Sequence, residues 1–247
     1  MVIVIIALLA TSASYGVRSA QRQAKQTHCK SNLRQFGVAV QLYRAQNNFR
    51  NPAWLSNLYP EYIDSKHLYT CRSDPTKGEG LIIPQGLVDK GHSNYPGIND
   101  QRSNGNRPGA NTDIEQCSYF YEFSMQNSAF GALTGAGQWP TNNGNPISFD
   151  GDEDKFTWCD WKENQLRFGD QQSKFKPYSS SQLPIVRCWH HHAEAQIDAR
   201  PQDWFIEDAC PASQLGRDAI TLNVSYEGNV YVGPLKWECT RQPGDGR

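Results

Sequence analysis

An acidic loop in the second half of this 247-residue chain has the side chains that calcium prefers. Asp150-Gly-Asp-Glu-Asp154 places carboxylates at the first, third and fifth positions, the spacing of an oxygen-ligand calcium loop. The glycine at position six and the glutamate at position twelve of an EF-hand are missing, which argues against that motif. Two interpretations remain: a calcium ion held by Asp150, Asp152 and Asp154, and a solvated acidic turn. We predict no cofactor other than this calcium ion, and the fold does not require it.

A run of three histidines, His190-His-His192, follows a segment that the pattern predicts to be a strand, Gln182–Trp189. Imidazoles bind transition metals, but adjacent residues of a strand point to opposite faces. Three in a row therefore rarely form one site, and we expect a structural or surface role for them. Asn223-Val-Ser225 matches the acceptor pattern for N-glycosylation, which makes Asn223 a candidate attachment site.

The cysteines indicate an oxidising compartment, because seven of them occur in a chain that is rich in Gly, Pro and aromatic residues. An odd number leaves at least one unpaired unless two chains are cross-linked. The spacing does not choose among the pairings. The cysteines are Cys29, Cys71, Cys117, Cys159, Cys188, Cys210 and Cys239.

Charge and motifs narrow the function classes. The net charge is −1, so the chain as a whole gives no basis for nucleic-acid binding. The sequence contains no hydrolase elbow, zincin helix or kinase motif set, and nothing ties two of its carboxylates into an acid/base couple. We therefore expect a protein that is not an enzyme.

The segment from Met1 to Gln46 is the element that organises the chain. Residues 1–17 are mainly apolar, and residues 18–46 are basic and amphipathic. Within residues 18–46, apolar positions recur at spacings of four and three, which is the period of a single helical face, and no proline occurs before Pro52. A continuous helix could therefore cover the whole segment, at ~1.5 Å per residue about 70 Å long. The apolar face consists of Cys29, Leu33, Phe36, Val40 and Tyr43.

The apolar start of this helix is shorter than the ~20 residues needed to span a bilayer. A secretory signal would need a basic region before it, although Thr11-Ser-Ala13 could pass as a weak cleavage site. The large apolar side chains could contribute roughly 10–20 kcal/mol if they were buried against other copies of the helix. Small residues at Thr11–Ser14 and Gly16 permit close helix approach but weaken helix propensity. We predict a locally loosened helix at Ser12–Gly16. The predicted interface consists of Met1, Val2, Ile3, Val4, Ile5, Ile6, Leu8 and Leu9.

Three stretches together resemble type IV pilins and type II secretion pseudopilins, in particular pilin-like proteins with a prepilin-type cleavage and methylation segment. They are Val2–Ala10 with the basic region after it, Cys29-Lys-Ser-Asn-Leu-Arg-Gln-Phe-Gly37, and Cys71-Arg-Ser-Asp-Pro75. The resemblance extends more loosely to Ser118–Tyr121 and to Leu222–Tyr231. In the latter, Glu227-Gly-Asn-Val230 replaces the Asp-Gly-His-Val turn of the family.

The resemblance implies an α+β fold, with a long N-terminal spine (1–46) and a loop-rich head (47–247) built on a small antiparallel sheet. It implies a Cys29–Cys71 disulfide; the alternative is that Cys29 is a small buried residue of the helix face. It also implies a structural subunit that polymerises with itself into an extracellular filament. Its precursor would be anchored in the inner membrane and handled there by pilus or secretion assembly machinery.

The family's cleavage glycine, aromatic residue and glutamate are absent ahead of Val2. Two readings remain: the sequence begins a few residues inside the mature protein, which we prefer, or the subunit assembles without that glutamate.

A different class of function is also compatible with the sequence. Numerous tryptophans could form a stacking surface on a membrane-anchored, secreted carbohydrate-binding domain. Aromatic core packing explains them equally well. The residues concerned are Trp139, Trp158, Trp161, Trp189 and Trp204. Filaments or dispersed particles under the electron microscope would separate the two classes.

For the head itself, the sequence predicts a short helix or turn at Trp54–Ile63 and a strand at Cys117–Phe123. A hairpin is predicted from Ala219–Ser225 and Asn229–Val232. Gly- and Pro-rich stretches at 76–111 and 129–151 are predicted to be loops.

Overall fold

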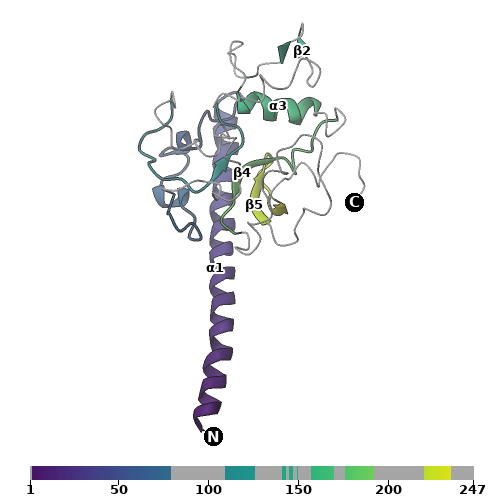
Figure 1. The fold of residues 1–247 in the computed structure, drawn as a ribbon. Coiled ribbons are helices and arrows are strands. Elements are labelled where there is room, and N and C mark those ends of the chain that lie inside the picture. Colours follow the sequence, from purple (N-terminus) through teal and green to yellow (C-terminus); the bar gives the residue numbers. More distant parts are fainter. Residues whose placement is uncertain are drawn as a thin grey trace.

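The computed structural model describes residues 2–78, 109–125, 141–142, 145–146, 149, 157–169, 176–191 and 220–234, with the side chains of the helix described from residue 17 onward. Within these residues the chain is an α+β protein, as predicted. A long N-terminal helix, α1 (Val2–Gln46), packs its C-terminal half against a four-stranded antiparallel sheet. Figure 1 shows the head gathered around that half while the N-terminal half projects away from it.

Helix α1 is continuous over 45 residues. The predicted loosening at Ser12–Gly16 is therefore wrong. The reason is that a serine or a glycine costs at most about 1 kcal/mol inside a helix, which is less than ending and renucleating the helix would cost. The helix ends where it was predicted to end: Asn48 and Phe49 adopt left-handed backbone conformations, with φ of 53° and 62°, and the amide of Phe49 donates to the Arg44 carbonyl.

The sheet has the order β1-β4-β5-β6, and all its pairings are antiparallel. Its strands are β1 (Phe120–Tyr121), β4 (Pro184–Cys188), β5 (Ile220–Ser225) and β6 (Val230–Pro234). The β5–β6 hairpin and the strand before His190 are as predicted, whereas the strand predicted at Cys117–Phe123 is reduced to two residues. A second pair, β2 (Thr141–Asn142) and β3 (Asn145–Pro146), lies in the stretch predicted to be loop.

Two short 3-10 helices, η1 (Leu55–Leu58) and η2 (Lys66–Tyr69), follow α1, and η1 confirms the short helix predicted there. Helix α3 (Trp158–Phe168) was not predicted. Its signal is a capping box: the Thr157 hydroxyl accepts from the Asp160 amide, and the Asp160 carboxylate accepts from the Thr157 amide. Most of the buried residues of α3 are polar, so the sequence shows no apolar helix face there.

The core is formed where α1 meets the sheet. The predicted helix face is confirmed, because Cys29, Leu33 and Phe36 are fully buried and Val40 is nearly so. The Phe36 ring lies between Tyr69 and Tyr119, with ring centroids 5.2 and 5.1 Å away. Residues 17–25 of the same helix are all exposed. We call residues 2–28 of α1 the stalk; the head is the described chain after α1, and it packs around residues 29–46 of the helix. Among the described residues, no helix is long and apolar enough to cross a membrane.

Candidate functional site

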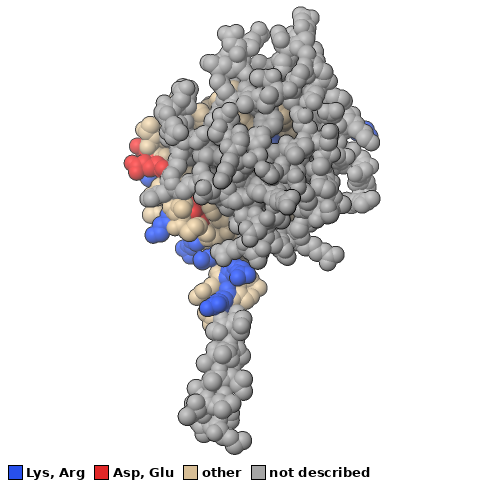
Figure 2. Space-filling view, in the orientation of Figure 1, with Lys and Arg blue, Asp and Glu red and all other residues tan. Residues whose placement is uncertain are grey.

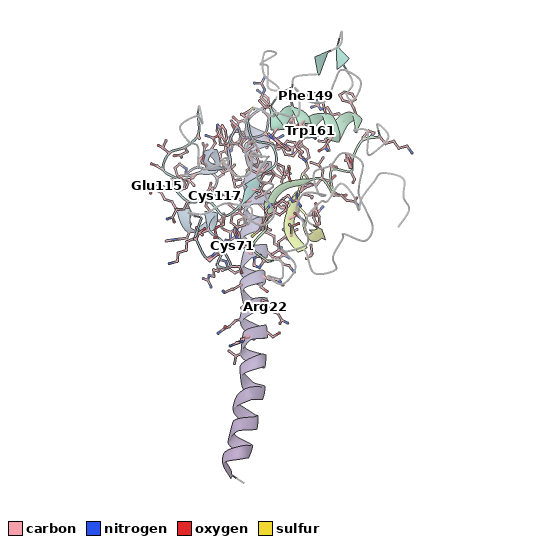
Figure 3. The ribbon with its side chains drawn as sticks, viewed as in Figure 1. Arg22, Cys71, Glu115, Cys117, Phe149 and Trp161 are labelled. Carbon is pink, nitrogen blue, oxygen red and sulfur yellow. The ribbon has the colours of Figure 1, made fainter. Side chains whose placement is uncertain are left out.

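Three cysteines and one histidine from distant parts of the sequence meet beside α1. They are Cys29 in α1, Cys71 after η2, Cys188 at the end of β4, and His191 three residues later. The four ligand atoms, three Sγ and one imidazole nitrogen, all lie within 4.8 Å of one another, and all four residues are buried. We call these residues the thiol–imidazole cluster. Figure 3 shows Cys71 beside α1 at the end of the head from which the stalk emerges.

The turn that carries Cys71 is held by Asp74, the aspartate of the Cys71-Arg-Ser-Asp-Pro75 motif. One Asp74 oxygen accepts from the Thr76 amide (2.9 Å), and the other accepts from the Gly78 amide (2.7 Å) and the Ser118 hydroxyl (2.7 Å). Burial raises the pKa of this carboxyl, but the charge of His190 and the hydrogen bonds outweigh burial and hold the pKa below its usual value. Asp74 therefore fixes the backbone on which Cys71 is presented.

The part of helix α1 that carries Cys29 is held against the head by Asn32 and, further along the helix, by Gly37. The Asn32 amide nitrogen donates to the Leu68 carbonyl (3.1 Å) and to the Tyr119 hydroxyl (3.0 Å), which ties α1 to η2 and to the segment before β1. Gly37 lies against the β5–β6 hairpin, where an added Cβ would sit 2.8 Å from the Val224 Cγ2 atom. Asn32 and Gly37 thus help to hold the head on the helix.

Polar groups surround the cluster and point at its ligand atoms. The Ser73 amide donates to Cys71 Sγ (3.4 Å), and the Ser73 hydroxyl lies 3.4 Å from Nδ1 of His191. This contact turns Nε2 of His191 toward Cys71 Sγ, 3.3 Å away. The Tyr119 hydroxyl donates to Cys29 Sγ (3.7 Å). Two of the sulfurs thus accept hydrogen bonds from outside the cluster, and the imidazole is oriented by a serine.

The three thiols do not have equal acidity. Burial raises the pKa of Cys29 and of Cys188 well above the usual range of a thiol. Hydrogen bonds from Cys188 and Cys29 lower the pKa of Cys71 instead. All three are free thiols in this structure. Two chemistries are open to such a set: ligation of a soft metal ion by thiolates and imidazole, and oxidation of one sulfur pair to a disulfide.

The structure brings together the predicted pair Cys29 and Cys71, but it does not join them, and the disulfide stays a prediction. Sequence reasoning missed Cys188 and His191 as their neighbours. The histidine run does not act as one unit: His191 joins the cluster, while Nε2 of His190 lies 3.5 Å from the Asp74 carboxylate. His192 lies outside the described residues. The cysteines Cys117 and Cys159 are buried outside the cluster, and Cys210 and Cys239 are not described.

Other predicted sites fare differently. Asp150, Asp152 and Asp154 lie outside the described residues. Asn223 is fully buried, its Oδ1 accepts from Arg187 and its amide nitrogen donates to the Thr221 carbonyl. Its glycosylation stays a prediction. For the predicted polymer interface, the structure describes the helical backbone from Val2 to Leu9 but not the side chains, and Met1 is not described.

The tryptophans within the described residues do not form an open stacking platform. Trp158 and Trp189 are buried, and Trp161 is half-buried with its ring stacked on Trp158. Trp139 and Trp204 lie outside the described residues.

Comparisons of the chain with protein-family models, with curated proteins and with solved structures find no match.

Proposed function

We propose that this protein is a structural, non-enzymatic subunit of a pilus-like or pseudopilus extracellular filament, which polymerises through the stalk of α1. The observation that supports this most is that helix α1 extends well beyond the part of it that packs on the head. Residues 17–25 are exposed around more than two full turns, and among the side chains described from residue 17 onward the first fully buried one is Cys29. In the described part of the chain, residues 17–25 of the helix are therefore exposed and not packed into the core.

A helix in that situation needs other contacts. Isolated helices are marginal in water, and this one opens with a run of large aliphatic residues. Sister helices can bury those residues when subunits associate head to tail without closing into a ring, and such contacts give an open helical filament. Three exposed apolar side chains on and just after the head portion of the helix offer further contact area: Val38, Leu42 and Phe49.

The charge of the stalk fits a membrane stage before assembly. No acidic residue precedes Glu61, and Arg18, Arg22 and Lys25 are exposed just beyond the apolar start. Figure 2 shows Lys and Arg side chains gathered where the helix leaves the head, and Figure 3 labels Arg22 there. These basic side chains would be attracted electrostatically to the anionic headgroups of a bilayer in which the apolar N-terminal end of the helix is inserted. An inner-membrane precursor, assembly machinery beside it and a final place at the cell surface belong to this proposal.

Electron microscopy tests the proposal. Material sheared from the surface of the cells that make the protein should contain filaments labelled by antibodies against the head. Ile5→Lys should abolish them, because a charge would enter the packed helices, whereas Thr112→Lys adds a positive charge at an exposed position of the head and should leave them intact. Labelled particles that stay dispersed in the unmodified strain would instead favour a membrane-anchored ligand-binding domain.

A further inference from the structure

We propose that the thiol–imidazole cluster is a structural zinc site, with Cys29, Cys71, Cys188 and His191 as its four ligands. A tetrahedral zinc ion with Zn–S bonds of ~2.3 Å and a Zn–N bond of ~2.0–2.1 Å separates its ligand atoms by about 3.5–3.8 Å. The four atoms here lie within 4.8 Å of one another, and Cys71 Sγ lies 3.3 Å from His191 Nε2. Small side-chain adjustments close the difference.

The donor set selects the class of metal. Three sulfurs and one imidazole nitrogen suit a soft or borderline ion, and they exclude calcium and magnesium, which require oxygen ligands. The ligand residues are buried, with exposed fractions of 0, 2, 0 and 8 % for Cys29, Cys71, Cys188 and His191. A closed set of four protein ligands leaves no open position for water or substrate, which is the arrangement of structural rather than catalytic zinc.

The surroundings of the cluster fit a metal better than a single disulfide. A disulfide uses two of the three sulfurs and leaves the third sulfur and the imidazole without a chemical role. Zinc uses all four ligands. The hydrogen bonds from the Ser73 amide and the Tyr119 hydroxyl then fall on metal-bound sulfurs, and the Ser73 hydroxyl holds the outer nitrogen of the His191 ligand. Outer contacts of this kind orient the ligands of metal sites.

The position of the site indicates that zinc would cross-link the helix to the head. Its ligands come from α1, from the turn after η2 and from the end of β4, so a single ion ties the spine to two separate segments of the head. Of the helix side chains described from residue 17 onward, that of Cys29 is also the first that is fully buried, which places the ion at the junction with the stalk. Zinc would hold the helix to the head in a monomer as well as in a filament, so the site is independent of the filament proposal.

Metal analysis of the full chain, purified without chelators and without added reductant, tests the site. We expect about one zinc per chain, and X-ray absorption should give three sulfurs at ~2.3 Å and one nitrogen at ~2.0–2.1 Å. Cobalt substituted for zinc should give the visible spectrum of a tetrahedral thiolate site. Cys188→Ser and His191→Ala should each lower the zinc content severalfold or more. Cys159→Ser removes a buried cysteine outside the cluster and should leave the content unchanged.

Several results would overturn the proposal. One is a wild-type chain that is folded and metal-free, with a Cys29–Cys71 or Cys29–Cys188 disulfide in its non-reducing peptide map. Another is zinc retained at full content in both ligand variants. The cobalt spectrum and the absorption data come from the unmodified chain, so they decide the question even where a ligand variant fails to fold. Filament formation is scored separately, and its presence or absence does not enter this result.

Discussion

At the scale of single residues, buried polar side chains decide which segments of the head are joined. Glu122 is 1 % exposed, and its two oxygens each lie 3.1 Å from a buried cation, Arg187 in β4 and Lys162 in α3. Arg187 also donates to Asn223 and Thr221 of β5. Glu122 thus connects the sheet to α3 by charge-assisted hydrogen bonds rather than by apolar contact.

Removing the charge of Glu122 should be costly. Glu122→Gln keeps the shape of the side chain but leaves two buried cations without its carboxylate, and breaking such a pair typically costs about 3–5 kcal/mol. Urea unfolding should show the loss as a lower midpoint. Glu115→Gln, the same change at an exposed position, is the control and should alter stability by less than about 0.5 kcal/mol. Equal midpoints for the two variants would mean that Glu122 contributes no net stability.

Tyr226 makes the head sensitive to alkali. Burial, and then the Glu163 carboxylate, raise its pKa to about 12. The unfolded chain has a pKa of about 10, so below about pH 10 both states hold the proton and the full contribution to stability is present. Between about pH 10 and 12 the unfolded state loses its proton first, and stability falls. Melting temperatures measured across this range should drop less steeply for Tyr226→Phe than for the wild type. Parallel curves would contradict the assignment.

At the scale of elements, the contact between α1 and the β5–β6 hairpin sets the position of the helix. Gly37 permits close approach to Val224 and to the backbone of Gly228. One and two turns further along the helix, Gln41 and Arg44 both donate to the Tyr226 carbonyl. The Arg44 guanidinium also lies 3.8 Å from the centroid of the Tyr226 ring. The hairpin turn is thus clamped on the helix by a steric fit and a polar contact.

Gly37→Ala should destabilise the protein although alanine favours a helix. Helix propensity would add up to ~1 kcal/mol, but a Cβ placed 2.8 Å from Val224 Cγ2 forces the hairpin outward, and overpacking of this kind costs about 1–3 kcal/mol. We expect a net loss of about 1 kcal/mol in urea unfolding. Ser31→Ala, at an exposed position of the same helix, should be neutral or slightly stabilising. A stabilised Gly37→Ala variant would show that the β5–β6 hairpin can move away from the helix without a loss in the free energy of unfolding.

Much of this arrangement was predictable from local pattern. The face from Cys29 to Val40, the end of α1 and the β5–β6 hairpin follow from periodicity and turn residues. The proximity of Cys188 and His191 to Cys29 and Cys71 was not predictable from local pattern. It depends on which strand packs beside α1 and on the position along the helix at which that strand ends. Helix α3 was missed for a related reason: its buried residues are mostly polar, and Lys162 finds its partner far away in the sequence.

At the scale of the whole molecule, Cys29 divides the chain into the stalk before it and the remaining part, in which the helix packs on the head. The described side chains of the stalk before that residue are exposed or half-buried, while the core, the Asn32 contacts and the thiol–imidazole cluster all lie from Cys29 onward. The stability of the head therefore depends little on the stalk. Self-association should depend on it strongly, since the stalk carries the aliphatic run.

Truncation separates these two properties. A chain without residues 1–20 should keep the urea midpoint of the full head, because residues 17–20 are exposed and none of the described core contacts is lost. Light scattering after gel filtration should find it a monomer without detergent, whereas the full chain should associate or require detergent. A chain without residues 1–33 is the control: it loses Cys29, Asn32 and Leu33 and should not fold. Two results would contradict this prediction. One is that the shorter deletion unfolds the head, and the other is that the full-length chain is itself a monomer without detergent. Either result would indicate that the stalk packs on its own domain. A helix engaged in that way is not available to sister subunits.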